Sequence, residues 1–229
     1  MKELKVIYED NHIIVVVKPQ NIPSQSDITG DEDMLSLVKE YVKEKYNKPG
    51  EVYIGLVHRL DRPTGGVMVF ARTSKAASRL SEQIKDGTFS KTYLAIVEGT
   101  PKEREARLVN FLKKDEKDNL VKIVPMGESG AKRAELVYQT LETEKNMALL
   151  KVNILTGRSH QIRVQLSNIS LPLVGDGKYG SKITASKKLC LWATELSFKH
   201  PTKDETLSFK VYPPEEAPWS EFQLRKHLG

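Results

Sequence analysis

Short apolar segments recur along this chain, and turn residues close almost every one of them. The segments are rich in Val, Ile, Tyr and Phe, and Asn, Asp, Gly or Pro separate them. This composition is typical of β-strands joined by turns. We therefore expect strands at residues 5–10, 12–19, 51–60, 65–73, 90–99, 120–125, 134–142, 146–155, 188–198 and 206–214.

A few segments repeat their apolar residues with a helical period instead, namely residues 33–46, 73–87 and 157–168. Gly87 is typical of a helix end. Because most strands follow one another through short turns, with few helices between them, the pattern predicts an α+β fold. We expect a mixed, mostly antiparallel sheet with a few flanking helices. The charged stretch 113–119 is expected to be a hairpin tip, and residues 221–229 a short surface helix.

The chain of 229 residues contains no internal repeat, low-complexity tract or Gly/Ser linker, which predicts a single domain over residues 1–229. Its one cysteine, Cys190, lies in an apolar run and has no partner for an intramolecular disulfide. This suggests a reducing compartment. The longest aliphatic run, residues 13–17, is far shorter than the ~20 residues of a membrane span, and the first residues contain no apolar signal core. We expect a soluble cytoplasmic protein with no membrane partner.

The charge balance favours a polyanionic partner only modestly. Basic residues number 36 and acidic residues 30, which gives a net charge of +6 and a sequence pI near 9.2. Such a balance is compatible with nucleic-acid binding, and equally with an ordinary enzyme whose charges cancel locally.

Several familiar cofactor and metal sites are missing from the sequence. GDGKYG at residues 175–180 lacks the spacing of a phosphate loop and predicts a tight turn. No G-x-G-x-x-G follows a strand, and no G-x-S-x-G marks a serine hydrolase. The five histidines are scattered and have no Cys-x-x-Cys beside them, so we expect no zinc. An enzyme with this sequence would work through side chains, without a metal or a bound cofactor.

One short stretch, HRLDRPTGG at residues 58–66, combines several side chains that can take part in catalysis. Asp61 lies between two arginines, and an aspartate is ionised at neutral pH. A carboxylate held dry beside a guanidinium is a nucleophile that needs no activating base. The plain alternative is a solvated ion pair in a surface loop.

Four blocks of the chain, in order, resemble the pseudouridine synthases of the RluA type, which are related to ribosomal large-subunit and tRNA enzymes. The blocks are YEDNHIIVVVKPQNIPSQ (8–25), HRLDRPTGGVMVFARTSKAA (58–77), SKTYLAIVEG (90–99) and TGRSHQIRVQLSNISLPLVGDGKYG (156–180). The resemblance implies the pseudouridine-synthase-like α+β catalytic domain. Because the opening block begins by residue 8, we expect no accessory RNA-binding domain before it.

The resemblance also implies a reaction. Uridine in structured RNA, either rRNA or tRNA, is detached from its ribose at nitrogen, turned within the site and rejoined through ring carbon 5. The aspartate matching Asp61 starts the cleavage. It attacks the uracil ring, attacks the ribose, or removes a ribose proton, and these three roles stay open.

Two further residues of the matched blocks are expected to be catalytic. Tyr93 matches the tyrosine that lies against the target base, and its ring suits stacking better than proton abstraction, because a phenol is neutral at pH 7. Arg163 matches the arginine that pairs with the catalytic aspartate, and a guanidinium can fix both carboxylate oxygens. Without the resemblance, Tyr93 would be a core aromatic and Arg163 an exposed helix charge.

Candidate substrate-binding residues surround these positions: His58, Arg59, Thr64, His160 and Lys18. The arginine matching Arg59 helps to fill the space that an extruded uridine leaves. His160 is expected either to contact phosphate or to cap its helix, and Lys18 to bind phosphate. Many relatives carry Thr-Ser-Gly where this chain has Thr64, Gly65 and Gly66, so how firmly the loop after Asp61 is held is in doubt.

The expected partner is RNA, with no metal, and the expected state is a monomer. Two rival interpretations remain. One is an RNA-binding or folding factor that keeps the scaffold and does no chemistry, which intact Asp61, Tyr93 and Arg163 argue against. The other is a carboxylate-dependent glycosidase, which would need a second acidic residue about 5 to 10 Å from the first. No acidic residue in the matched blocks is an obvious candidate.

Overall fold

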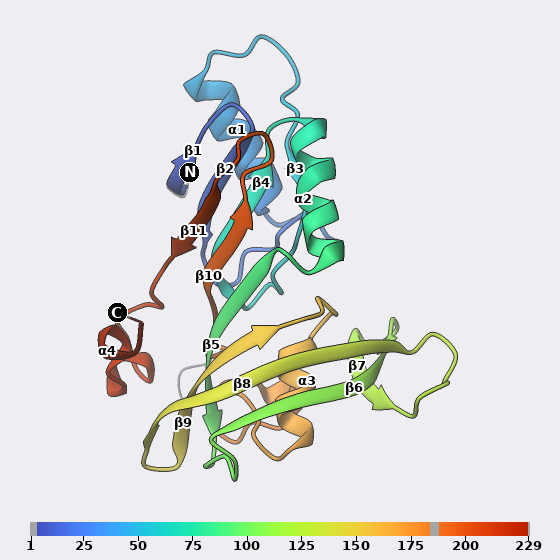
Figure 1. Cartoon of the computed structure of the whole chain (residues 1–229), viewed down its shortest axis with the longest axis vertical. Helices are drawn as coiled ribbons and strands as arrows, with labels where there is room; N and C mark the ends of the chain where they lie inside the picture. The colour runs from blue at the N-terminus through green and yellow to red at the C-terminus, as the bar shows by residue number, and fades with distance from the viewer. Residues whose placement is uncertain (1–3, 184–187, 229) are drawn as a thin grey trace. The chain divides into compact units, whose positions relative to one another are not determined.

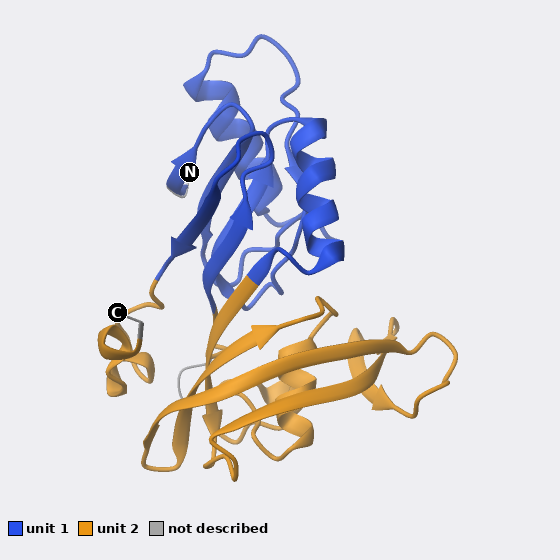
Figure 2. Cartoon of the chain, in the orientation of Figure 1, with its two compact units in different colours: residues 1–90, 193–211 blue, residues 91–192, 212–229 orange. Residues whose placement is uncertain are grey.

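The computed structural model describes residues 4–183 and 188–228. The chain forms two compact units, shown in Figure 2. Unit 1 consists of residues 1–90 and 193–211, and unit 2 consists of residues 91–192 and 212–229. Neither unit is one continuous piece of sequence.

Unit 1 is a twisted sheet with two helices (Figure 1). Its strands lie in the order β1-β2-β4-β10, with β3 beside β4 and β11 beside β10. The pairings β1–β2, β2–β4, β3–β4 and β10–β11 are all antiparallel. The elements are β1 (Lys5–Glu9), β2 (Ile13–Lys18), α1 (Met34–Lys45), β3 (Gly55–Leu56), β4 (Gly65–Ala71), α2 (Ser74–Asp86), β10 (Leu191–Lys199) and β11 (Thr206–Lys210).

The core of unit 1 follows from its most apolar segments. Every residue of β4 is buried, and β2 is buried at all positions but one. Both helices begin where the sequence supplies a capping side chain, since Asp33 accepts from the N–H of Ser36 and Thr73 from that of Ala76. Gly87 ends α2 with a left-handed φ of 76°, as expected.

Unit 2 is an antiparallel sheet in the order β5-β9-β8-β6-β7. The helix α3 contacts β6 and β7, and the long hairpins of this sheet are visible in Figure 1. The elements are β5 (Ser90–Glu98), β6 (Glu105–Asp115), β7 (Leu120–Val124), β8 (Lys132–Glu144), β9 (Met147–Ile154), α3 (Gln161–Asn168), η1 (Gly177–Tyr179), η2 (Trp219–Glu221) and α4 (Leu224–Leu228).

The predicted α+β class is confirmed, and so are most of the predicted elements. Two strand predictions need correction. Of residues 51–60 only Gly55–Leu56 joins the sheet. The strand β6 was missed altogether, because its half-buried positions are interleaved with Arg107, an exposed Val109 and charged residues near its end. Among the described residues, no helix is both long and apolar enough to cross a membrane.

Gly66→Ala tests the close approach of two strands in unit 1. Gly66 has φ +127°, and a Cβ atom there would lie 2.2 Å from the carbonyl oxygen of Ala193. Backbone strain and overpacking together should lower the free energy of unfolding by about 2 to 5 kcal/mol. Urea unfolding measures this, with Gly50→Ala as control, since nothing lies within 4 Å of a Cβ at Gly50. A neutral Gly66→Ala would contradict the packing described.

Candidate active site

The loop that carries Asp61 is bound along its backbone by the segment that follows β2. Ser24 Oγ donates to the carbonyl of Leu60 at 2.8 Å and accepts from the N–H of the same residue at 3.1 Å. The N–H of Asn21 donates to the carbonyl of Arg62 at 2.8 Å. These bonds pair backbone groups at Leu60 and Arg62 that lie outside the sheet.

The loop is closed around Asp61 itself by one further turn. The N–H of Thr64 donates to the carbonyl of Asp61 at 2.9 Å, and Gln20 Nε2 donates to the carbonyl of Pro63 at 2.9 Å. Asp61 is half-buried. The loop before Gly65 and Gly66 is thus held by its own turn and by residues 18–24.

Lys18 is the most buried of these anchors. Its side chain is fully buried, and Nζ donates to the carbonyls of Pro19 at 3.0 Å, Arg62 at 3.0 Å and Thr64 at 2.7 Å. Burial lowers the pKa of Lys18 to about 7, although the nearby Asp61 carboxylate acts to raise it. An ammonium has three N–H groups, and these three carbonyls take them all. Phosphate binding by Lys18 has no support in these contacts; the residue holds the loop.

Arg62, which the sequence analysis did not select, connects the same loop to residues 27–31. Its guanidinium pairs with the carboxylate of Asp31, lies 3.8 Å from that of Asp27, and donates to Thr29 Oγ1 at 3.2 Å. These side chains are exposed, so each pair contributes little stability by itself. The contacts nevertheless give the backbone after Asp61 a second attachment.

The three other candidates in this stretch differ in exposure. His58 is buried, and its Nε2 accepts the N–H of Val69 at 3.1 Å, which ties the loop to β4. Thr64 is buried, and its hydroxyl meets no hydrogen-bond partner within residues 4–183 and 188–228. Arg59 is exposed. Of the three, Arg59 has the most exposed side chain.

In unit 2, Arg163 is held by a carboxylate that the sequence analysis missed. Nε and Nη2 of Arg163 donate to Asp176 Oδ2 and Oδ1 at 2.7 and 2.8 Å. Both side chains are buried, and the guanidinium carbon lies 5.0 Å from the centre of the Tyr179 ring. Asp176 and Tyr179 belong to GDGKYG, the stretch predicted to be only a tight turn. The turn is present as η1, and it also supplies these two contacts.

His160 occupies the position before α3, with a left-handed φ of 50°, but its side chain makes no capping hydrogen bond. The capping prediction is therefore wrong for the side chain. Instead, Nδ1 lies 2.8 Å from the hydroxyl of Tyr179, which also accepts the N–H of Val121 at 2.9 Å. His160 and Arg163 thus contact the same tyrosine from one helix.

The helix α3 carries buried polar side chains as well as apolar ones. Gln161 donates to the carbonyl of Glu135 at 3.0 Å and accepts from Thr156 at 2.8 Å. Gln165 donates to Asn110 Oδ1 at 2.7 Å. These bonds fix the helix on β6 and β8, so the backbone of Arg163 is held rigidly.

Tyr93 lies in β5 and is 6 % exposed, opposite Val152 of β9. The candidate residues therefore fall into two groups. Unit 1 contains Lys18, His58, Arg59, Asp61 and Thr64, and unit 2 contains Tyr93, His160 and Arg163. No three His, Cys, Asp or Glu side chains gather into a group that could hold a metal ion in the described part of the chain.

Lys18→Met tests the buried amine. The folded-state pKa of about 7 lies below the ordinary 10.5, so between these values the unfolded chain binds the extra proton and stability rises with pH. We expect the free energy of unfolding of the wild type, minus that of Lys18→Met, to increase as pH rises through this window. Urea unfolding at several pH values measures it, and the exposed Lys48→Met serves as control. If this difference in the free energy of unfolding did not change with pH, a lowered pKa of Lys18 would be ruled out.

The comparisons with known proteins agree on one family. The family model described as RNA pseudouridylate synthase matches residues 12–168. Ribosomal large subunit pseudouridine synthase C of Haemophilus influenzae is 32 % identical over 91 % of this chain and 65 % of its own length. An uncharacterized RNA pseudouridine synthase of Bacillus subtilis is 29 % identical over 90 % of this chain and 67 % of its own. The chain thus spans about two thirds of these curated relatives.

A solved structure supports the fold. Human RNA pseudouridylate synthase domain containing 4 matches with a TM-score of 0.77 at 23 % identity, over 92 % of this chain and 88 % of its own. The residues matched by the family model include the loop of Asp61 and the helix of Arg163. The chain belongs to the RNA pseudouridine synthase family, and its enzyme class is that of an RNA-modifying isomerase.

Proposed function

We propose that this chain isomerises uridine in structured RNA, either rRNA or tRNA, with Asp61 as the catalytic carboxylate. The observation that carries the proposal is the loop 58–66, whose backbone is bound at successive residues by the segment 18–24. A half-buried carboxylate on such a loop keeps one orientation while a nucleotide is turned beside it.

The proposed reaction conserves every atom of the uridine. The bond between ribose carbon 1 and ring nitrogen 1 breaks, and a new bond forms between the same ribose carbon and ring carbon 5. The proton on carbon 5 is lost, and nitrogen 1 gains a proton. Ionised Asp61 starts the cleavage by attack on the ring, by attack on the ribose, or by removal of a ribose proton. The side chains named here are the only catalytic groups that the proposal uses.

Arg163 is proposed to orient the Asp61 carboxylate, and Tyr93 to stack on the loosened uracil. Asp176 holds the Arg163 guanidinium through two parallel hydrogen bonds. Anchoring by Asp176 and by the Tyr179 ring restricts the guanidinium to one plane, which a point charge such as lysine would not provide. Stacking of a base on Tyr93 would contribute about 1 to 3 kcal/mol.

Around the target uridine, Arg59 is proposed to fill the space left by extrusion, since its side chain is exposed. The buried Thr64 hydroxyl and the His160 imidazole are proposed to contribute to substrate binding. We further propose that residues 1–229 act as one catalytic domain and as a monomer in the cytoplasm. The family match at residues 12–168 draws on both units, which supports the single domain.

Asp61→Asn is the decisive variant. An amide of the same shape cannot act as nucleophile or base, so release of tritium from uridine carbon 5 in RNA should fall by a factor on the order of a thousand or more. The control is Asp86→Asn, because Asp86 is exposed at the end of α2. A binding factor without chemistry would release no tritium even as wild type, and a glycosidase would release free uracil. Wild-type activity that survives in Asp61→Asn would refute the assignment.

Arg163→Lys tests the orienting role. Lysine keeps the charge but cannot reproduce the planar two-bond contact with Asp176, so kcat should fall while KM for RNA changes little. Asp176→Asn removes a charged partner of the buried guanidinium and should also lower the free energy of unfolding by about 3 to 5 kcal/mol. Arg79→Lys, on the exposed side of α2, is the matched control. An unchanged kcat in folded Arg163→Lys would contradict the proposal.

A further inference from the structure

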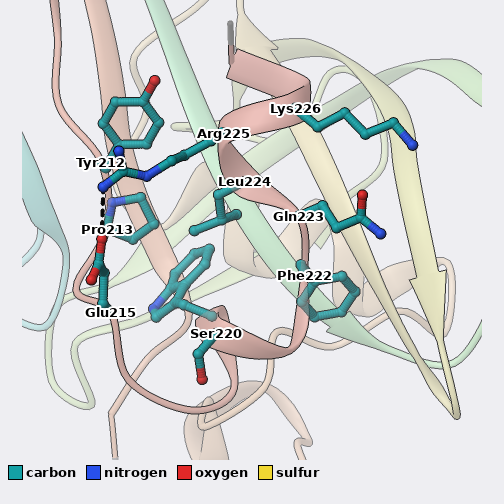
Figure 3. A pocket seen from close by; sticks show the side chains of 10 residues that line it. Tyr212, Pro213, Glu215, Ser220, Phe222, Gln223, Leu224, Arg225 and Lys226 are labelled. Carbon is teal, nitrogen blue, oxygen red and sulfur yellow. Dashed lines mark hydrogen bonds and ion pairs between the residues drawn. The ribbon is translucent and has the colours of Figure 1, made fainter.

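A cavity of about 550 Å³ lies in the C-terminal part of unit 2 and contains none of the residues considered so far (Figure 3). Its lining includes Tyr212, Trp219, Phe222, Arg225 and Lys226. Cavities of this size commonly take small organic ligands. The sequence analysis predicted a strand at residues 206–214 and a short surface helix at residues 221–229 here, and no binding site.

The cavity is aromatic inside and open at one aromatic edge. Trp219 and Phe222 are 3 % and 5 % exposed, so they form a packed floor. Tyr212 is 43 % exposed, so its ring is open to solvent. A planar ligand can therefore reach this ring.

The rim of the cavity carries positive charge that a ligand can use. Arg225 pairs with Glu215 at 3.0 Å, and Figure 3 shows this contact on the same side of the cavity as Tyr212. Both partners are more than 80 % exposed, so the pair is weak and an anion can replace Glu215. Lys226 is also exposed, but Figure 3 shows its side chain pointing away from Tyr212 and Arg225.

Hydrogen bonds and an ion pair hold one wall of the cavity in place without a ligand. Oε2 of Glu142, at the end of β8, accepts the N–H of Gln223 at 3.0 Å and lies 2.9 Å from Nε2 of His227. Lys145 binds Glu221 at 3.0 Å. The segment from Glu221 to His227, which includes Arg225 and Lys226 of α4, is thus attached at both ends to the hairpin of β8 and β9.

We propose that this cavity binds an unpaired nucleotide of the RNA, with the base stacked on Tyr212 and a phosphate on Arg225. An aromatic face beside a guanidinium matches the two parts of a nucleotide, a flat base and an anion. An apolar peptide would fill the floor but make no use of the guanidinium. The inference rests on the proposed function, because it assumes that the ligand belongs to the RNA substrate.

The test uses a labelled single-stranded oligoadenylate, which contains no uridine and so gives the proposed catalytic residues nothing to isomerise. Binding is followed by fluorescence anisotropy on the full chain. Because stacking tolerates any base, oligoadenylate should bind, and Tyr212→Leu should raise its dissociation constant at least about fivefold. Tyr212→Phe keeps the ring and should bind like the wild type.

The charged rim is tested in the same assay. Arg225→Ala should weaken binding and make the dependence of the dissociation constant on salt less steep, whereas Lys48→Ala, an exposed lysine of unit 1, serves as the control. Asp61→Asn should bind oligoadenylate normally, so loss of isomerisation and loss of this site give different results. Equal binding by Tyr212→Leu and wild type, or no binding by the wild type, would overturn the proposal.

Discussion

The contact between the Lys18 ammonium and three backbone carbonyls organises the loop of Asp61. An irregular loop beside a buried strand exposes carbonyl groups that need partners, and unpaired buried groups are costly. Lys18 satisfies those of Pro19, Arg62 and Thr64 at once. The ammonium that makes these bonds is buried, and burial lowers the pKa of Lys18 to about 7. The loop therefore has a defined shape at the expense of a buried cation.

Unit 2 also contains a buried cation, but a carboxylate and not backbone carbonyls is its partner. There the buried cation is Arg163, and a buried carboxylate, Asp176, neutralises it through two parallel hydrogen bonds. Glutamines of α3 fasten the helix to the sheet beneath it. In both units a polar side chain is fixed by several bonds to rigid neighbours, and this is the arrangement that a catalytic group requires.

Local patterns predicted most of the fold. The helices α1 and α2 were predictable because caps and apolar stripes coincide, and β2 and β4 because their apolar runs are long. The strand β6 was not, since its pattern is diluted by charges. Of the site, the stretch around Asp61 was recognisable from its motif. The contacts of Lys18 and Asp176 join residues 44 to 46 and 13 positions apart, and no local pattern reports such pairs.

The interleaved connectivity of the two units sets the order in which the protein can be completed during synthesis. Strands β10 and β11 belong largely to unit 1 but are translated after nearly all of unit 2. At about 5 to 20 residues per second, the ribosome needs on the order of ten seconds to move from residue 90 to residue 211. Until residues 191–199 are translated, the buried strand β4 has β2 beside it but lacks β10, its neighbour on the other side. The nascent chain must therefore keep an apolar sheet edge from aggregating during this time.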